Sequence, residues 1–422
     1  MNNENREVLL KVEHLEQFFK LGKRYNRAVN DVNFEVYKGE VFGLVGESGC
    51  GKTTTGRSII KLYDITSGSV YFKGQRIAAG IRSYQIAIKN AKAKAKEEIQ
   101  RLTAQLSEGA NPEEINSKIQ LVKEELAQVI AYNKEEIAKA KHDHFKCEHD
   151  YSKRLLAELE EEFAPKFEAA ANNPEELAKV KKEYASRRKI AKSPHLVTQI
   201  QMIFQDPIAS LNPRMTVEEI ISEGLVIRGI TDKEYIKEQV YNILETVGLV
   251  REHATRYPHE FSGGQRQRIG IARSVIMNPE MIIADEPISA LDVSIQAQVI
   301  NLLRDLRDKL GLTVLFIAHD LSVVKYFSDR IGVMYYGKLV ELADADELFA
   351  HPMHPYTKSL LSAIPLPDPN YEKQRIRIKY NALAAHDYSV DKPTLREIVP
   401  GHYVSCNDEE ERRYREEYNS AE

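Results

Sequence analysis

A glycine-rich segment near residue 50 has residue types and a spacing that suit nucleotide binding. It consists of Gly46, Glu47, Ser48, Gly49, Cys50, Gly51, Lys52 and Thr53, followed by Thr54. Glycines let backbone N–H groups approach phosphate oxygens, the lysine reaches the β- and γ-phosphates, and the next hydroxyl ligates Mg²⁺. The segment therefore predicts a P-loop that binds ATP and Mg²⁺, in which Cys50 is a tolerated small residue rather than a redox centre.

Two further segments supply groups that phosphoryl transfer needs. Asp285 closes a short apolar run and Glu286 follows it. A carboxylate at the end of a buried strand can hold Mg²⁺ through water, and a second one beside it can polarise the attacking water. A helical pattern opens with Ser262, Gly263, Gly264 and Gln265. Backbone N–H groups at such a helix start bind anions and would suit a γ-phosphate, although the tetrapeptide alone would be an ordinary helix cap.

The elements that position these residues follow from the hydrophobic pattern. Residues 40–45 form a short apolar run that Gly46 ends, as a buried strand feeding a loop would. Residues 281–284 and 314–317 are further apolar runs, and apolar residues alternate over 200–204. Short strands that are buried on both faces indicate parallel pairing, so the pattern predicts an α/β sheet.

The order of these motifs resembles the ABC ATPase cassette. The resemblance implies an α/β P-loop fold, with a RecA-like core, an antiparallel β subdomain and a helical subdomain at residues 206–262. It also implies that Gln205 is the Q-loop glutamine, which senses Mg²⁺ and the membrane partner. Asp292 is then the D-loop aspartate, and His319 is the switch histidine that contacts the γ-phosphate.

The same resemblance assigns the remaining site residues. The implied catalytic group is Glu286, His319 and Gln205, and the implied metal ligands are Thr53, Gln205 and Asp285. Phe19, or failing that Phe18, is similar to the aromatic residue that stacks on adenine. In this family the Ser-Gly-Gly-Gln segment of one cassette caps ATP held by another, so this chain, with one cassette, must pair with itself or with a related subunit.

A narrower resemblance is to the ATPases of oligopeptide and dipeptide importers. It rests on residues 204–207 (FQDP), 210–214 (SLNPR), 257–261 (YPHEF), 354–357 (HPYT) and 362–365 (SAIP). It implies an ATPase at the cytoplasmic face of the cell membrane that works with a second ABC ATPase, two transmembrane permeases and an external binding protein. Some relatives bind an iron-sulfur cluster through several cysteines in the tail. Only Cys406 is present there, so we expect none.

A Lys-, Glu- and Ala-rich segment interrupts the cassette. Its apolar residues repeat at alternating steps of four and three and are Ile115, Ile119, Val122, Leu126 and Val129. This spacing predicts an inserted helical coiled-coil arm, whose helices begin after Asn111 and Asn173 at Asn-Pro-Glu-Glu sequences. We expect a protruding rod on which the cassette does not depend. The expected domains are 1–82 and 197–350 for the cassette, 83–196 for the arm, and 351–422 for a C-terminal extension with a mobile acidic end.

Composition excludes several classes of protein. The 422 residues contain 59 basic and 63 acidic side chains, and the net charge of -4 argues against a chain that coats nucleic acid. Three cysteines in no metal-binding spacing fit a reducing cytoplasm. No apolar run approaches the roughly 20 residues that span a bilayer. If the chain acts at a membrane, it must therefore dock there as a peripheral protein.

Two alternatives stay open from the sequence. Nickel and glutathione importers share much of the peptide-type tail, and an ATPase does not touch cargo. DNA-repair and chromosome ATPases also interrupt a cassette with a coiled coil, but there the coil follows the Q-loop glutamine, whereas Gln205 follows the arm here.

Overall fold

The computed structural model describes residues 6–22, 24–107, 111–192, 196–364, 377–388 and 391–421. Within these ranges the side chains of residues 107, 143–150, 383, 384 and 421 are not described, so the side chain of Cys147 lies outside the description. None of the helices in the described part of the chain is both long enough and apolar enough to cross a bilayer.

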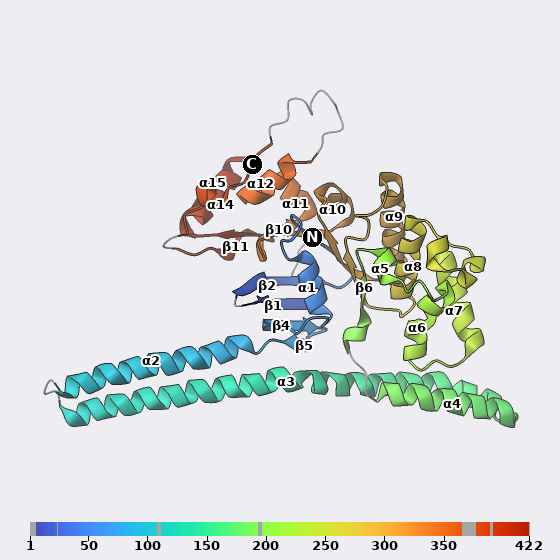
Figure 1. Cartoon of the computed structure of the whole chain (residues 1–422), viewed down its shortest axis with the longest axis horizontal. Coiled ribbons are helices and arrows are strands. Elements are labelled where there is room, and N and C mark those ends of the chain that lie inside the picture. The colour runs from blue at the N-terminus through green and yellow to red at the C-terminus, as the bar shows by residue number, and fades with distance from the viewer. Residues whose placement is uncertain are drawn as a thin grey trace.

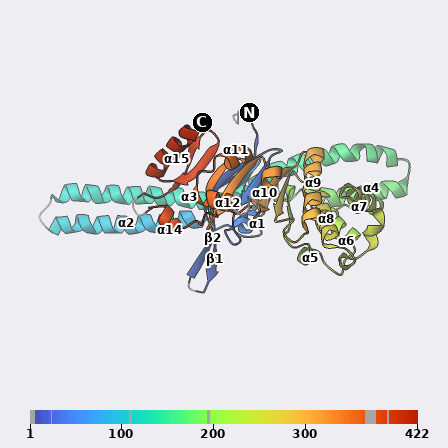
Figure 2. The same cartoon turned by 90° about the horizontal axis from the view of Figure 1, so that it is seen from above.

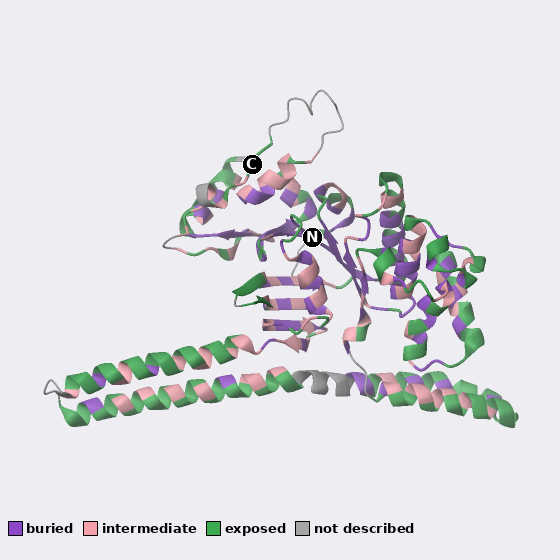
Figure 3. Cartoon of the chain, in the orientation of Figure 1, coloured by how far each residue is buried: buried purple, intermediate pink, exposed green. Residues whose placement is uncertain are grey.

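The larger sheet crosses the centre of the molecule and, among the described residues, has eight strands in the order β11-β12-β10-β9-β3-β8-β7-β6. Strands β9, β3, β8, β7 and β6 run parallel, which confirms the predicted parallel pairing, and β10, β12 and β11 continue the sheet antiparallel. The bounds are β3 Val41–Val45, β6 Ile200–Ile203, β7 Met281–Asp285, β8 Thr313–Ala318, β9 Arg330–Tyr335, β10 Lys338–Asp344, β11 Thr394–Val399 and β12 His402–Cys406. The parallel strands are buried, as Figure 3 shows.

The second sheet is antiparallel and corresponds to the expected β subdomain. Its strands, in the order β2-β1-β4-β5, are β1 Val8–Leu21, β2 Arg24–Tyr37, β4 Ser67–Phe72 and β5 Gln75–Ala79. Leu10 and Val36 of this sheet share a buried cluster with Phe42 and Leu315 of the larger sheet. The two sheets therefore form one continuous core.

Helices cover the remaining faces of the larger sheet (Figure 1). Helix α1, Lys52–Ile59, follows the P-loop. The helical subdomain contains α5 Pro207–Ser210, α6 Val217–Ile227, α7 Lys233–Thr246, the 3₁₀ turns η3 Arg251–Thr255 and η4 Pro258–Glu260, and α8 Gly263–Val275. The later helices are α9 Val293–Leu310, α10 Leu321–Phe327, α11 Ala345–Ala350, α12 Pro355–Ser362, α14 Ala382–Ala385 and α15 Asp408–Ala421. A second buried cluster joins the helical subdomain to the sheet, for example Ile221 and Val240 with Phe316.

In the described part of the inserted segment the chain forms three helices and a short turn. They are α2 Arg82–Ser107, α3 Pro112–Ala170, α4 Pro174–Ala191 and η2 Leu196–Gln199. The Asn111 side chain accepts a hydrogen bond from Glu113 N–H, and the Asn173 side chain accepts from the N–H groups of Glu175 and Glu176. Both predicted helix starts are confirmed, with proline at the first helical position.

The predicted apolar stripe faces α2 only over its first part. Ile115 is buried, whereas Val129 is 39% exposed. Beyond Leu126 the residues that continue the buried stripe are the half-buried Ile130 and the buried Asn133. A straight helix has 3.6 residues per turn and drifts by about 20° per heptad, so a step of four replaces the expected step of three. The coiled-coil geometry of the arm stays a prediction.

The expectation of a rod independent of the cassette is wrong. Helix α3 pairs with α2 along one half and with α4 along the other, and between these parts it contacts β5 (Figures 1 and 2). Tyr151 of α3 is 7% exposed and belongs to the same buried cluster as Leu196 and Ile200. The Ser152 hydroxyl donates a hydrogen bond of 2.6 Å to the Ala191 carbonyl. The middle of the arm is thus part of the cassette core.

The far half of the arm also contacts the helical subdomain. Gly229, which follows α6, adopts φ +78°, and a Cβ at this position would lie 2.6 Å from the Ile190 Cδ1 atom of α4 and 3.0 Å from the Ser186 Oγ atom. On α3 and α4, Arg187 donates to both carboxylate oxygens of Glu162, at 2.8 and 2.7 Å. The arm therefore spans from the antiparallel sheet to the helical subdomain.

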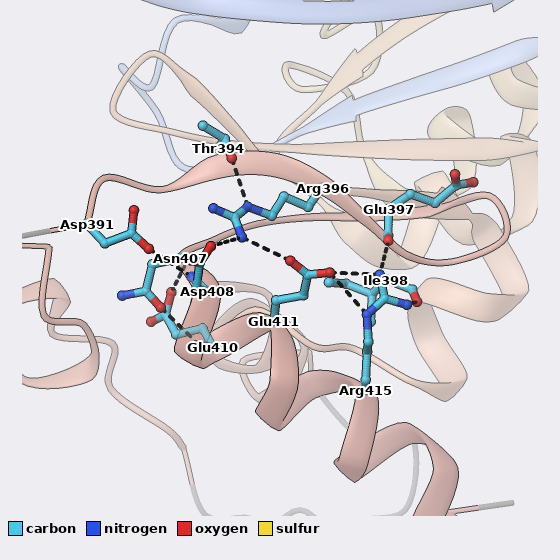
Figure 4. A network of polar contacts seen from close by, with 10 residues as sticks. All are labelled: Asp391, Thr394, Arg396, Glu397, Ile398, Asn407, Asp408, Glu410, Glu411 and Arg415. Carbon is cyan, nitrogen blue, oxygen red and sulfur yellow. Dashed lines mark hydrogen bonds and ion pairs between the residues drawn. The ribbon is translucent and has the colours of Figure 1, made fainter.

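The expected mobility of the acidic C-terminal run is also wrong, because the run forms helix α15 (Figure 4). Arg396 of β11 lies between Asp408 and Glu411, and Arg415 donates to Glu411 and to two backbone carbonyls of β11. Tyr414, on the inner face, is 2% exposed. Charges spaced by one helical turn thus pair with the adjacent strand, while the tyrosine anchors the helix.

We expect Tyr151→Ala to lower the melting temperature of the full chain. Loss of the ring leaves a cavity between α3 and the sheet, and large aromatic-to-alanine changes in a core cost about 3–5 kcal/mol. Tyr132→Ala is the matched control, since Tyr132 lies on the same helix and is 63% exposed. Thermal melts of the two variants beside the wild type measure the difference. Equal melting of both variants and the wild type would show that the arm does not contribute to the core.

Candidate functional site

The P-loop connects the end of β3 to the start of α1. The Lys52 side chain is 3% exposed and folds back over the loop, where its Nζ atom donates to the carbonyls of Gly46 at 2.7 Å and Glu47 at 3.0 Å. Cys50 is buried, and burial raises the pKa of its thiol. A buried thiol that stays protonated is a poor nucleophile, in agreement with its interpretation as a tolerated small residue.

Two positions of the loop must be glycine because the backbone of a neighbouring strand lies too close for a side chain. Gly46 adopts φ +150°, and a Cβ there would lie 2.2 Å from the Met334 carbonyl oxygen. Gly51 adopts φ +109°, and a Cβ there would lie 2.3 Å from the Ala28 carbonyl oxygen. Any side chain at either position would collide with β9 or β2, so the loop conformation depends on glycine.

Thr53 and Asp285 form an oxygen-rich corner beside the loop. The Thr53 hydroxyl donates to Asp285 Oδ1 at 2.7 Å. Asp285 Oδ2 is buried and has no hydrogen-bond partner among the residues that the structure describes. Burial raises the pKa of Asp285, with the Thr53 hydroxyl acting in the opposite direction. A hard divalent cation would favour the ionised carboxylate and use the free oxygen, so this corner fits such an ion.

Glu286 is the centre on which the other site residues converge. Gln205 Nε2 donates to Glu286 Oε2 at 3.0 Å, and His319 Nδ1 lies 3.3 Å from the same oxygen. Lys52 Nζ lies 3.9 Å from Glu286 Oε1. The expected catalytic residues, Glu286, Gln205 and His319, therefore meet within hydrogen-bond distance, although they are far apart in the sequence.

The backbone of Glu286 is held in an uncommon conformation, at φ +44°. Its N–H donates to the Ile317 carbonyl of β8 at 2.9 Å, and its own carbonyl accepts from the Ser289 hydroxyl at 3.1 Å. Non-glycine residues in the left-handed region cost about 1–3 kcal/mol and cluster at functional sites. These two bonds fix the direction in which the carboxylate leaves the strand.

A cavity of about 620 Å³ opens beside these residues. Its lining comprises Ser48, Gln205, Asp206, Glu286, Ser289, Ala290 and His319. Asp206, Ser289 and Ala290 were not among the expected site residues, and their only sequence signal is that they adjoin predicted motifs. A larger cavity, of about 850 Å³, lies between β1, β2 and the β11–β12 hairpin and contains no P-loop residue. We assign the site to the smaller cavity, because it contains the convergent polar groups.

The Ser-Gly-Gly-Gln segment does not line this cavity. The Ser262 hydroxyl accepts from Gln265 N–H at 3.4 Å, and Gln265 Oε1 accepts from Ser262 N–H at 3.1 Å, which caps helix α8. A Cβ at Gly264 would lie 2.6 Å from the Ile295 Cγ2 atom of α9, whose N-cap is Asp292. The segment and the expected D-loop aspartate therefore lie close together, and the segment is outside the cavity that contains Glu286.

Neither candidate for adenine stacking lines the cavity. The Phe19 ring lies edge-on to Tyr63 with 5.2 Å between the centroids. The Phe18 ring contacts the guanidinium groups of Arg27 and Arg82, at 5.2 and 5.1 Å. Both assignments stay predictions.

A P-loop at the end of parallel strand β3, with a buried aspartate at the end of β7 and a glutamate directly after it, defines an ATP-hydrolysing P-loop cassette. The family model described as ABC transporter matches residues 29–165 and 167–289. A second model, described as the C-terminal region of oligopeptide/dipeptide transporters, matches residues 340–390. The chain belongs to the ABC transporter family, and it is an ATPase.

Curated relatives are similar along nearly the whole chain. An oligopeptide transport ATP-binding protein of Bacillus subtilis, OppF, is 46% identical over 406 residues, which cover 96% of this chain and 98% of the relative. The oligopeptide transport ATP-binding protein AmiF of Streptococcus pneumoniae is 42% identical, covering 98% and 99%. The dipeptide transport ATP-binding protein DppF of Lactococcus lactis is 40% identical, covering 96% of each.

Solved structures of cassettes are also similar. A dimeric ATP-binding cassette in a post-hydrolysis state, bound to ADP and phosphate, is 20% identical with a TM-score of 0.48, covering 80% of this chain and 99% of that chain. The protein cbiO1 of Clostridium perfringens, part of the ABC transporter complex cbiONQ, is 19% identical, also with a TM-score of 0.48, covering 82% of this chain and 91% of that chain.

We expect Glu286→Gln to keep ATP binding and to reduce ATP turnover by roughly a hundredfold or more, the usual contribution of a positioned base. The amide keeps the size of the side chain but cannot polarise water as a carboxylate does. ATP binding and steady-state phosphate release, both measured on the assembled complex, separate the two effects. The control is Glu409→Gln on the exposed face of α15, which should behave as wild type. Near-normal turnover by Glu286→Gln would remove this role from Glu286.

Proposed function

We infer that this chain hydrolyses Mg-ATP to power the import of oligopeptides or dipeptides through separate permease subunits. The observation that carries this proposal is the convergence of Lys52, Gln205 and His319 on Glu286, in a chain whose relatives are named for peptide transport. The Thr53–Asp285 corner would hold Mg²⁺, with Gln205 nearby, and the loop from Gly46 would bind the phosphates. Phe19 or Phe18 would stack on adenine.

The position of the Ser-Gly-Gly-Gln segment supports pairing of two cassettes. Residues 262–265 lie at the free start of α8 and do not line the cavity that contains Glu286 and Ser48. A second cassette would present its own helix start to the P-loop of this chain, and Ser262 of this chain would cap the nucleotide of the partner. The partner would be a non-identical ABC ATPase, and the pair would dock at the cytoplasmic face of two transmembrane permeases served by an external binding protein.

Nickel or glutathione import is the nearest alternative function. The full-length similarity to peptide transport ATP-binding proteins and the match of residues 340–390 to the oligopeptide/dipeptide C-terminal region favour peptides. A DNA-directed ATPase with a coiled coil is the alternative of a different class. The order of the chain disfavours it, because the arm helices precede Gln205 rather than follow it.

Peptide uptake tests the cargo. In cells that lack this gene, the wild-type chain should restore uptake of labelled tri- and tetrapeptides, whereas Glu286→Gln should not, since transport needs hydrolysis. Labelled nickel and glutathione should enter equally with and without the gene, and survival after DNA damage should not change. Loss of nickel or glutathione uptake with normal peptide uptake would replace peptides by that cargo. Loss of survival alone would favour the DNA-directed class.

Sedimentation tests the pairing. The isolated chain should be mostly monomeric and a poor ATPase, because its nucleotide lacks the cap that a second cassette provides. Adding the partner ATPase together with the permeases should raise phosphate release by at least about tenfold, a change that corresponds to about 1.4 kcal/mol in the barrier. A stable homodimer with full activity and no partner would contradict a heterologous pair.

A further inference from the structure

The HPYT segment, residues 354–357 of the C-terminal extension, reaches the nucleotide site. The backbone N–H of Glu47, inside the P-loop, donates a hydrogen bond of 3.0 Å to the hydroxyl of Tyr356. Tyr356 lies on α12, more than 300 residues further along the chain, as the separation of 309 positions shows. Its side chain is among the largest fully buried ones, at 1% exposed. Tyr356 does not line the cavity around Glu286, so the catalytic residues described above give it no role.

The peptide group between Gly46 and Glu47 is held at both of its polar ends. Its carbonyl, on Gly46, accepts from Lys52 Nζ at 2.7 Å, and its N–H, on Glu47, donates to Tyr356. The two ends of a trans peptide point in opposite directions, so the two bonds together fix the rotation of this peptide plane. The Lys52 ammonium has three donors and uses two of them on the carbonyls of Gly46 and Glu47, so one is left for the β- and γ-phosphates. Tyr356 is the side chain that holds the N–H end of this peptide.

The Tyr356 ring cannot readily leave its place. Its centroid lies 4.4 Å from the ring of Tyr335 and 5.5 Å from that of Tyr380. Tyr335 ends β9, the strand that pairs with β3 immediately before the P-loop. Burial raises the pKa of Tyr356, so the hydroxyl stays un-ionised. The loop and the ring that holds it are therefore fixed to the same pair of strands.

Buried polar groups anchor the backbone on which Tyr356 lies. The ring of His354, 2% exposed, accepts from Tyr356 N–H at 3.1 Å, and burial lowers the pKa of His354 to about 3, so the accepting nitrogen carries no proton. The N–H groups of Met353 and His354 donate to the two carboxylate oxygens of Glu341, at 2.7 and 3.1 Å. His402 Nε2 lies 2.8 Å from Glu341 as well. Strands β10 and β12 thus set the position of the tyrosine.

We propose that Tyr356 is a positioning residue of the ATP site, which fixes the first peptide of the P-loop through the Glu47 N–H and makes nucleotide affinity depend on the C-terminal extension. This deepens the proposed function, since it rests on Mg-ATP binding at the P-loop. The Tyr356 hydroxyl acts through the backbone of the P-loop and does not contact the phosphates.

The test compares Tyr356→Phe with Tyr380→Phe in the full-length chain. Both variants lose one hydroxyl from the same aromatic cluster, but only the first loses a hydrogen bond to the P-loop. The dissociation constant for Mg-ATP should rise roughly three- to tenfold in Tyr356→Phe, the range expected for loss of one hydrogen bond, and stay near wild type in Tyr380→Phe. The rise in melting temperature that Mg-ATP produces should shrink in Tyr356→Phe alone.

Amide hydrogen exchange in the wild type gives a second measurement that needs no variant. The Glu47 amide should be protected with and without Mg-ATP, because its acceptor does not depend on nucleotide. Fast exchange at Glu47, or equal Mg-ATP affinity of Tyr356→Phe and the wild type, would overturn the inference. Equal weakening by both phenylalanine variants would also overturn it, since it would mean a general effect of the cluster. Failure of the wild type to bind Mg-ATP would instead refute the proposed function.

Discussion

The site depends on the register of three parallel strands. Val45 of β3 pairs with Ala318 of β8, and Asp285 of β7 pairs with Ile317 of β8. Since the three strands run in the same direction, the residues that follow them leave the sheet at one edge. The P-loop, Glu286 and His319 are these residues. A slip of one position in any strand would turn its side chains to the other face and separate the groups that meet at Glu286.

Two buried charged groups at this edge of the sheet, Lys52 and Asp285, explain the hydrogen bonds within and beside the P-loop. Lys52 and Asp285 are both almost fully buried, and a buried ion is costly unless it is paired or hydrogen-bonded. Lys52 satisfies its ammonium with two carbonyls of its own loop, and Asp285 accepts from Thr53 with one oxygen. Phosphate oxygens and a divalent cation are the partners that would complete both groups. The hydrogen-bonding and charge capacity that Lys52 and Asp285 still have free therefore lies where the nucleotide would bind.

The two segments outside the common cassette are attached to it by buried contacts rather than by tethers. The arm places Tyr151 in the core between the sheets and Ile190 against Gly229 of the helical subdomain. The C-terminal extension adds β11 and β12 to the sheet and reaches the P-loop through Tyr356. The extension contacts the P-loop, and the arm contacts the subdomain that carries Ser262. Both segments are therefore placed where they can influence nucleotide binding.

The sequence by itself determined the chemistry and the local elements. Residue types within a few positions were enough to predict the P-loop, the acidic pair at the end of β7, and the helix starts at Asn111 and Asn173. Tertiary structure alone decided which distant groups meet. Nothing local distinguishes Tyr151 from exposed Tyr132, or Tyr356 from any other buried tyrosine. The acidic run of α15 was expected to be mobile, whereas Asp408 and Glu411 pair with Arg396 of β11. Such contacts arise from the packing of elements far apart in the chain, which residue spacing does not encode.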